Sequence, residues 1–270
     1  AKLFKGNGKV ILHGFDRPNL RLSVAQKTQW SKQLLAFLAD KKGQAGIVYC
    51  LSRKFTDEVA DFLKEHGFNA IPYHAGQEAD LRKRNQDRFM SEDAVVMVAT
   101  IAFGMGIDKP DIRYVCHLNL PSSMEAYYQE IGRAGRDGAP AETLLLYGLD
   151  DMRMRRMFIE EDGTDEEHKR RERKRLDSLI SYCEATQCRR VALLGYFDEE
   201  TQPCGNCDNC LNPPVTIDAT RQAQMLLSAI HRTGQAFGAG HVIYVLLGAD
   251  TEKIRQRGHE SLPTYGVGKD

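Results

Sequence analysis

Three cysteines lie within seven residues of the sequence, at Cys204, Cys207 and Cys210. The two gaps of two residues place three sulfurs on one tight loop, and the glycine and asparagines between them permit its turns. Three thiolates on a loop suit a closed tetrahedral zinc site that takes its fourth ligand from elsewhere. The alternative is a group of free buried thiols, for which packing gives little reason at this spacing.

Two further cysteines compete for the fourth ligand position. Cys183 and Cys188 lie five residues apart, which is about 140° around a helix, so both cannot face one ion. Cys188 is favoured because it is nearer the loop. Cys50 and Cys116 lie in apolar segments and are expected to pack in the core. The predicted ligands of a structural zinc ion are therefore Cys188, Cys204, Cys207 and Cys210.

A second candidate for chemistry is the segment 129–138, which contains two arginines among glycines. Arg133 and Arg136 are three residues apart and share one side of a helix end or of the turn after it. Arginine is the side chain that stabilises charge on a transferring phosphoryl group. A pair of surface salt bridges explains the two arginines equally well, so these residues alone leave both interpretations open.

The elements around these residues alternate between strand and helix, which predicts right-handed crossovers and a doubly wound parallel α/β sheet. Apolar runs predict strands, and apolar residues at helical spacing predict helices. Ser52 is the expected N-cap of the second helix, which ends near Gly67. The expected strands are 20–24, 46–51, 70–73, 94–100, 113–118 and 142–147, and the expected helices are 28–40, 53–66, 77–90 and 123–134.

The character of the chain changes after residue 148. Thr164 begins a capping box that opens a long helix with six basic residues between 169 and 175, which predicts either a solvated face or a stripe that faces DNA. Pro213 and Pro214 break the chain, and three short helices are expected at 219–231, 241–247 and 251–257. We therefore expect three domains: an α/β domain at 1–148, a helical zinc-binding subdomain at 149–213, and a small domain at 214–270.

The composition limits the possible classes of protein. Lys+Arg and Asp+Glu both number 37, so the formal net charge is zero, which excludes a uniformly basic nucleic-acid coat but not a local basic patch. No apolar segment is long enough for a signal peptide or a membrane span. The sequence predicts a cytoplasmic or nucleoid protein, or a nuclear one in a eukaryote, whose cysteines do not form disulfides.

Several segments resemble the motifs of superfamily-two helicases. Residues 129–138 (QEIGRAGRDG) resemble motif VI in the form typical of the RecQ family, residues 98–110 resemble its motif V, and residues 47–53 resemble motif IV. Residues 73–76 resemble the segment after motif IV, and residues 188–210 resemble the RecQ zinc-binding element, followed by the start of its winged helix. This combination identifies the chain as similar to the C-terminal part of a RecQ helicase core, with a second RecA-like lobe and a partial winged helix.

The resemblance implies an activity and roles for individual residues. RecQ helicases couple ATP hydrolysis with Mg²⁺ to 3′→5′ movement along single-stranded DNA, and act in recombination and repair. Arg133 and Arg136 would bind the phosphates, with Arg136 as the arginine finger. Gln129 would position them, and Asp108 would reach the ribose or an interface water.

The resemblance also implies where DNA binds. Positions that contact the DNA backbone in the family follow predicted strands, at the carboxyl edge where such sheets bind ligands. His74 has the alternative of a turn histidine satisfied within the protein. The expected partners are single-stranded DNA, duplex junctions and a single-strand-binding protein. The expected DNA contacts are Ser52, Arg53, His74 and Thr100 in the lobe, and Arg232, Arg255 and Arg257 in the winged-helix part.

One departure from the family bears on activity. No segment matches G-x-x-x-x-G-K-[ST], since the Gly-Asn-Gly-Lys at 6–9 is too short, and no Asp-Glu-x-His box follows a predicted strand, because the match at 165–168 (DEEH) opens the predicted long helix. The family carries both in a first RecA-like lobe, so the chain is expected to be part of a larger enzyme and inactive alone. Two alternatives are a non-enzymatic zinc and winged-helix module with a degenerate lobe, and an RNA helicase or translocase.

Overall fold

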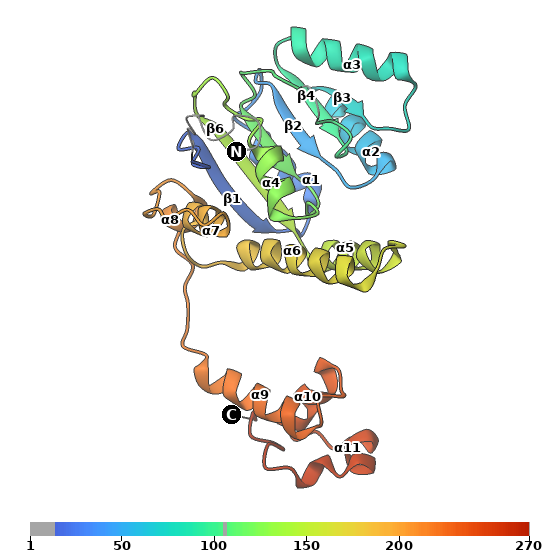
Figure 1. Cartoon of the computed structure of the whole chain (residues 1–270), viewed down its shortest axis with the longest axis vertical. Helices are drawn as coiled ribbons and strands as arrows, with labels where there is room; N and C mark the ends of the chain where they lie inside the picture. Colours follow the sequence, from blue (N-terminus) through green and yellow to red (C-terminus); the bar gives the residue numbers. More distant parts are fainter. Residues whose placement is uncertain (1–13, 105–106, 270) are drawn as a thin grey trace, which may run out of the picture. The chain divides into compact units, whose positions relative to one another are not determined.

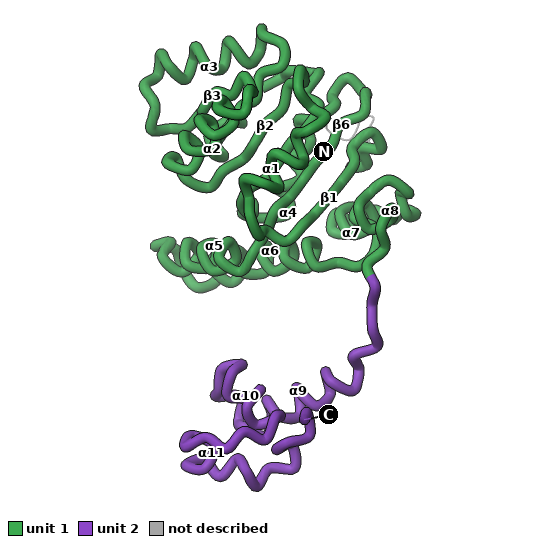
Figure 2. Tube along the Cα trace, turned by 180° about the vertical axis from the view of Figure 1, so that it is seen from behind, with its two compact units in different colours: residues 1–214 green, residues 215–270 purple. Residues whose placement is uncertain are grey.

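The structure is a computed structural model that describes residues 14–104 and 107–269. The glycine-containing segment at 6–9 and Met105 and Gly106 of motif V lie outside these residues. The chain divides into two compact units, one that ends at Pro214 and one that begins at Val215 (Figure 2). Within the described ranges, no helix combines the length and the apolar character that a membrane span needs.

The first unit is built on a sheet of six parallel strands, in the order β1-β6-β5-β2-β4-β3 (Figure 1). β2, β4 and β5 are buried along their whole length, as their continuous apolar sequences predict. The order confirms the expected doubly wound fold. The strands are β1 Leu20–Gln26, β2 Gly46–Tyr49, β3 Asn69–Tyr73, β4 Val95–Ala99, β5 Tyr114–His117 and β6 Ala141–Tyr147.

Helices cover both faces of the sheet. Leu34 of α1 and Leu63 of α2 belong to the apolar cluster on one face, and Phe89 of α3 and Tyr127 of α4 belong to the cluster on the other. Ser52 caps α2 as expected, because its Oγ accepts a hydrogen bond from the Phe55 N–H at 3.2 Å. The helices are α1 Trp30–Leu38, α2 Arg53–Glu65, α3 Ala79–Ser91 and α4 Met124–Ile131.

Four more helices follow the sheet in the first unit. They are α5 Leu149–Glu161, α6 Glu166–Glu184, α7 Arg189–Tyr196 and α8 Asp208–Leu211. The expected N-cap of α6 was wrong by one residue: Asp165, not Thr164, accepts the His168 N–H at 2.7 Å, because a carboxylate is a stronger acceptor at a helix N-terminus. The basic face of α6 is paired with acids, for example Arg173 with Glu160 at 2.7 Å, which favours the solvated face.

The second unit consists of short helices. Its helices α9, α10 and α11 each begin and end within two residues of the predicted bounds. Thr251 caps α11 by accepting the Ile254 N–H, and Gly258 ends it in the left-handed conformation with φ +67°. The bounds are α9 Thr220–Arg232, α10 Ala239–Leu246, α11 Glu252–Arg257 and a 3₁₀ turn at His259–Ser261.

Candidate active site and metal centre

The two motif VI arginines bind the loop that contains motif V. Arg133 donates a hydrogen bond to the carbonyl of Gly104. Arg136 donates to the carbonyl of Ile107 at 3.1 Å and pairs with the Asp108 carboxylate at 2.7 Å. The loop from β4 to β5 and the turn after α4 therefore meet through both arginines, and an open pocket of about 530 Å³ lies beside them.

Some polar side chains that line the pocket are exposed to solvent, and others are paired within the protein. Gln129 is exposed at its edge, and Asp108 is exposed apart from its pair with Arg136. Arg133 is more enclosed: its Nε is buried and has no hydrogen-bond partner among the described residues. A buried guanidinium donor without an acceptor, beside a second arginine, suits an anionic ligand such as a phosphate.

A buried acid–base pair links the end of β5 to α4 and was missed from the sequence. His117 Nε2 lies 2.7 Å from Glu130 Oε2, and both side chains are buried. The His117 ring stacks on Tyr49 at 5.0 Å, and Tyr49 donates a hydrogen bond to the Phe103 carbonyl at 3.3 Å. Burial raises the pKa of Tyr49, so its hydroxyl stays a neutral donor.

The predicted DNA contacts of the lobe lie at the carboxyl ends of β2, β3 and β4. Ser52 and Arg53 are exposed at the start of α2, where a helix N-terminus favours anions. Thr100 is buried just after β4. A Cβ on Gly76 would come within 2.9 Å of Arg53 Cδ and 3.2 Å of His74 Nδ1, so glycine lets these two side chains approach each other.

His74 is buried, as Thr100 is, but its side chain is also paired with an acid of the protein. Its Nε2 lies 3.1 Å from both carboxylate oxygens of Asp57, and its backbone N–H donates to Gln77 Oε1 at 3.4 Å. The pair with Asp57 favours the alternative of a histidine held within the protein, although its buried Nδ1 has no hydrogen-bond partner among the described residues. Nothing in the sequence indicated Asp57, which lies on α2 while His74 follows β3.

The predicted contacts of the second unit are all exposed. Arg232 is the last residue of α9, and Arg255 and Arg257 lie on α11. Arg255 makes a 3.4 Å pair with Asp250, and the Arg257 guanidinium lies 5.7 Å from the centre of the Phe237 ring. These three side chains remain available to a ligand, and their role stays a prediction.

The predicted set of four cysteines comes together at the start of α7 and α8. The Sγ atoms of Cys188, Cys204, Cys207 and Cys210 all lie within 4.8 Å of one another. Sulfurs around a tetrahedral zinc ion are about 3.8 Å apart, given Zn–S bonds of about 2.3 Å, so four thiolates here fit zinc.

Cys188 and Cys183 differ in their surroundings. Burial raises the pKa of the Cys188 thiol, but hydrogen bonds from the backbone N–H groups of Cys204 and Val191 more than offset it, and the pKa falls to about 7. Burial raises the pKa of Cys183 to about 12, which keeps that thiol protonated. The cluster in the described residues does not include Cys183.

The cysteine cluster is attached to the edge strand of the sheet. Asp208, next to Cys207, accepts the backbone N–H of Val24 in β1 at 2.8 Å and pairs with Arg189 at 3.0 Å. Arg189 also donates to the Cys183 carbonyl at 3.0 Å, and Arg190 donates to the Leu20 carbonyl at 2.7 Å. Helices α7 and α8, which carry the cysteine cluster, therefore cover the edge of β1.

Family models match three consecutive segments of the chain. The helicase conserved C-terminal domain matches residues 26–138, the RecQ zinc-binding element matches residues 149–211, and the RQC domain matches residues 213–270. The chain belongs to the RecQ helicase family. The resemblance inferred from the sequence is confirmed, and zinc is the structural metal of this RecQ element.

Bacterial RecQ proteins are among the similar sequences. The ATP-dependent DNA helicase RecQ of Haemophilus influenzae is 45% identical over 95% of this chain and 41% of its own length. Those of Pasteurella multocida and Bacillus subtilis are 43% and 40% identical over 97% and 96% of this chain, and over 41% and 44% of their own lengths. The chain therefore spans about two-fifths of the length of these RecQ relatives.

Proposed function

We propose that the chain is the second RecA-like lobe, zinc-binding subdomain and winged-helix part of an ATP-dependent 3′→5′ DNA helicase in recombination and repair. The observation that carries this proposal is the arginine pair, bound to the motif V loop beside an open pocket. A non-enzymatic module has no need of these arginines. The domain boundaries after residues 148 and 213 stay a prediction.

We infer that ATP with Mg²⁺ binds between this lobe and a first lobe. ATP would supply the phosphoryl group that is transferred, and Mg²⁺ would neutralise its charge. Arg136 and Arg133 would face the phosphates, with Arg136 as the finger. Gln129, at the pocket edge, would help to position the two arginines. Asp108 would orient Arg136 through their 2.7 Å ion pair. Asp108 would also reach the ribose or an interface water.

We further propose that the carboxyl edge of the sheet binds single-stranded DNA through its phosphates. Support comes from the exposed Ser52 and Arg53 at the N-terminus of α2 and from the close approach that Gly76 permits. Such contacts give salt-dependent binding without sequence preference. Thr100 would add a contact to the DNA backbone, and His74, whose Nε2 faces Asp57, stays a predicted contact. Duplex junctions and a single-strand-binding protein are the further proposed partners, in the nucleoid or the nucleus.

The assignment of the zinc ligands can be tested, because substitutions at Cys183 and Cys188 should have opposite effects on zinc content. We propose Cys188, Cys204, Cys207 and Cys210 as the ligands. Cys188→Ser should abolish stoichiometric zinc, whereas Cys183→Ser should retain one zinc ion per chain and lower the melting temperature only slightly. Elemental analysis of the purified variants measures this. Equal zinc loss from both substitutions would contradict the assignment.

The proposed function is tested by comparing this chain with the longer helicase that contains it. The longer protein should hydrolyse ATP when single-stranded DNA is added and should unwind a duplex with a 3′ overhang. The 270-residue chain should show neither activity, because the phosphate-binding loop and the Mg²⁺ carboxylate belong to the other lobe. DNA-stimulated turnover by the isolated chain, in proportion to its concentration, would overturn the proposal.

A further inference from the structure

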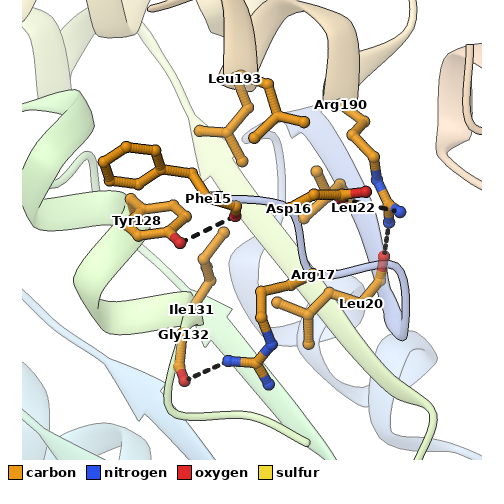
Figure 3. Close-up of a pocket in the computed structure, with 11 residues that line it drawn as sticks. Phe15, Asp16, Arg17, Leu20, Leu22, Tyr128, Ile131, Gly132, Arg190 and Leu193 are labelled. Carbon is orange, nitrogen blue, oxygen red and sulfur yellow. Dashed lines mark hydrogen bonds and ion pairs between the residues drawn. The ribbon is translucent and has the colours of Figure 1, made fainter. Parts of the chain in front are cut away.

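A short segment before β1 binds the turn that carries the two arginines. We call residues 15–19 the strap. Arg17 donates a hydrogen bond to the Gly132 carbonyl at 3.2 Å (Figure 3). It also donates to the carbonyls of Ala134 and Gly135 at 2.9 Å each. Asn19 donates to the Gly135 carbonyl at 2.8 Å. The strap thus binds the backbone on both sides of Arg133.

These carbonyls need such donors because α4 ends at Ile131. The last carbonyls of a helix and the turn after it have no partner within the helix, and a cation is favoured there. Gly135 has φ +58°, and a Cβ on it would meet the Ala139 carbonyl at 2.8 Å, so the turn is tightly enclosed. A planar guanidinium with several donors can bind three carbonyls at once, which an ammonium cannot do with the same geometry.

The strap is itself held by α4 and by the end of α7. The Phe15 ring stacks on Phe197 at 4.6 Å and meets Tyr128 edge-on at 5.5 Å. Tyr128 donates its hydroxyl hydrogen to the Phe15 carbonyl at 2.9 Å, and Asp16 pairs with Arg190 at 3.3 Å. Figure 3 shows Phe15, Asp16, Tyr128 and Arg190 around a pocket. The cavity among these side chains has a volume of only about 10 Å³, so little space remains between the strap and its neighbours.

We propose that Arg17 is a positioning residue for the arginine pair: by fixing the backbone from Gly132 to Gly135, it sets where Arg133 and Arg136 point. The inference rests on the proposed function, because a displaced arginine matters only if these side chains face a reacting phosphate. Arg17 lines the same pocket as the pair, but its donors are directed to the backbone carbonyls.

Steady-state ATPase kinetics of the longer protein test this role. Arg17→Gln should lower kcat by about tenfold to 100-fold, because misplacing a charged group by about 1 Å has effects of that size. KM for ATP, affinity for single-stranded DNA and melting temperature should stay within about twofold or a few degrees of the unsubstituted protein. Arg17→Lys should recover only part of the loss.

The matched control is Arg21→Gln, four residues along the chain. Arg21 is exposed, and its side chain makes no hydrogen bond in the described part of the structure, so kcat should not change. If Arg17→Gln keeps normal kcat, or loses kcat only in step with melting temperature, the positioning role is wrong. If the unsubstituted protein hydrolyses no ATP, the proposed function has failed instead.

A second measurement needs no activity and uses the 270-residue chain. The arginine Nε–H signals in a ¹⁵N–¹H NMR spectrum can be assigned with Arg133→Lys and Arg136→Lys. Arg17→Lys should move the Nε–H signals of Arg133 and Arg136, while Arg21→Lys should leave both signals in place. Unmoved signals in a folded Arg17→Lys chain would contradict the proposal.

Discussion

Arg136→Ala in the longer helicase should lower ATP turnover by about 10³-fold or more, within the range of effects seen for arginine fingers. A finger acts mostly on charge that develops during phosphoryl transfer, so it stabilises the transition state more than bound ATP. ATP affinity should therefore change much less than kcat. Arg136→Lys should not restore turnover, because a point charge cannot reproduce the planar fork. Single-turnover hydrolysis and equilibrium ATP binding separate the two effects.

The structure adds a control for this prediction. Arg136 pairs with Asp108, so Asp108→Asn should weaken this ion pair but leave the positive charge of Arg136 in place. Asp108→Asn should therefore lower turnover less than Arg136→Ala. Single-stranded DNA binding without nucleotide should survive both substitutions, since the proposed DNA edge lies at Ser52 and Arg53. Normal turnover in Arg136→Ala with lost turnover in Arg133→Ala would reverse the two roles. Normal turnover in both would leave a structural salt-bridge pair.

Removal of zinc should have the largest effect on stability. Zinc contributes on the order of 10 kcal/mol to small zinc modules. Even half of that should lower the melting temperature of a chain of this size by about 10 °C or more, at about 2–4 °C per kcal/mol. Cys207→Ser, at a fully buried position, should reproduce the effect of a chelator. Thermal melting with and without chelator, together with limited proteolysis between α7 and α8, measures the loss.

The control for zinc removal is recovery. Returning zinc to the chelated chain should restore the melting temperature, whereas Cys207→Ser should not respond to added zinc. Cys50 lies in the core of the sheet, and Cys50→Ala should keep its zinc. This variant shows whether loss of a buried thiol alone lowers the melting temperature as much as loss of zinc. An unchanged melting temperature after complete zinc removal would show that the metal is dispensable for the fold.

The doubly wound sheet could be predicted because its information is local. The apolar runs that became β2 and β4 are buried on both faces, and the Ser52 cap acts over three residues. The cysteine spacing and the arginine spacing are local as well. α5 was not anticipated because its apolar residues, such as Leu149 and Phe158, are largely exposed and give no clear core-facing pattern.

Contacts between residues distant in the sequence could not be predicted. Arg17 binds carbonyls more than a hundred residues away, and Asp208 binds a backbone N–H of β1. The pairing of His117 with Glu130 depends on how α4 packs on β5. Backbone carbonyls have no sequence signature, so an arginine that binds them looks like any surface arginine until the fold is known.

The order of the strands has a consequence for synthesis of the protein. Among the strands of the described sheet, β1 is made first, but it pairs with β6, which is made last, from Leu20 with Ala141 onward. The acceptor for its Val24 N–H, Asp208, is made later still. At about 5–20 residues per second, a ribosome needs on the order of 10–40 s between these two residues. During that time the nascent lobe presents an unpaired strand edge, which is the kind of surface that chaperones bind and that associates with neighbouring chains.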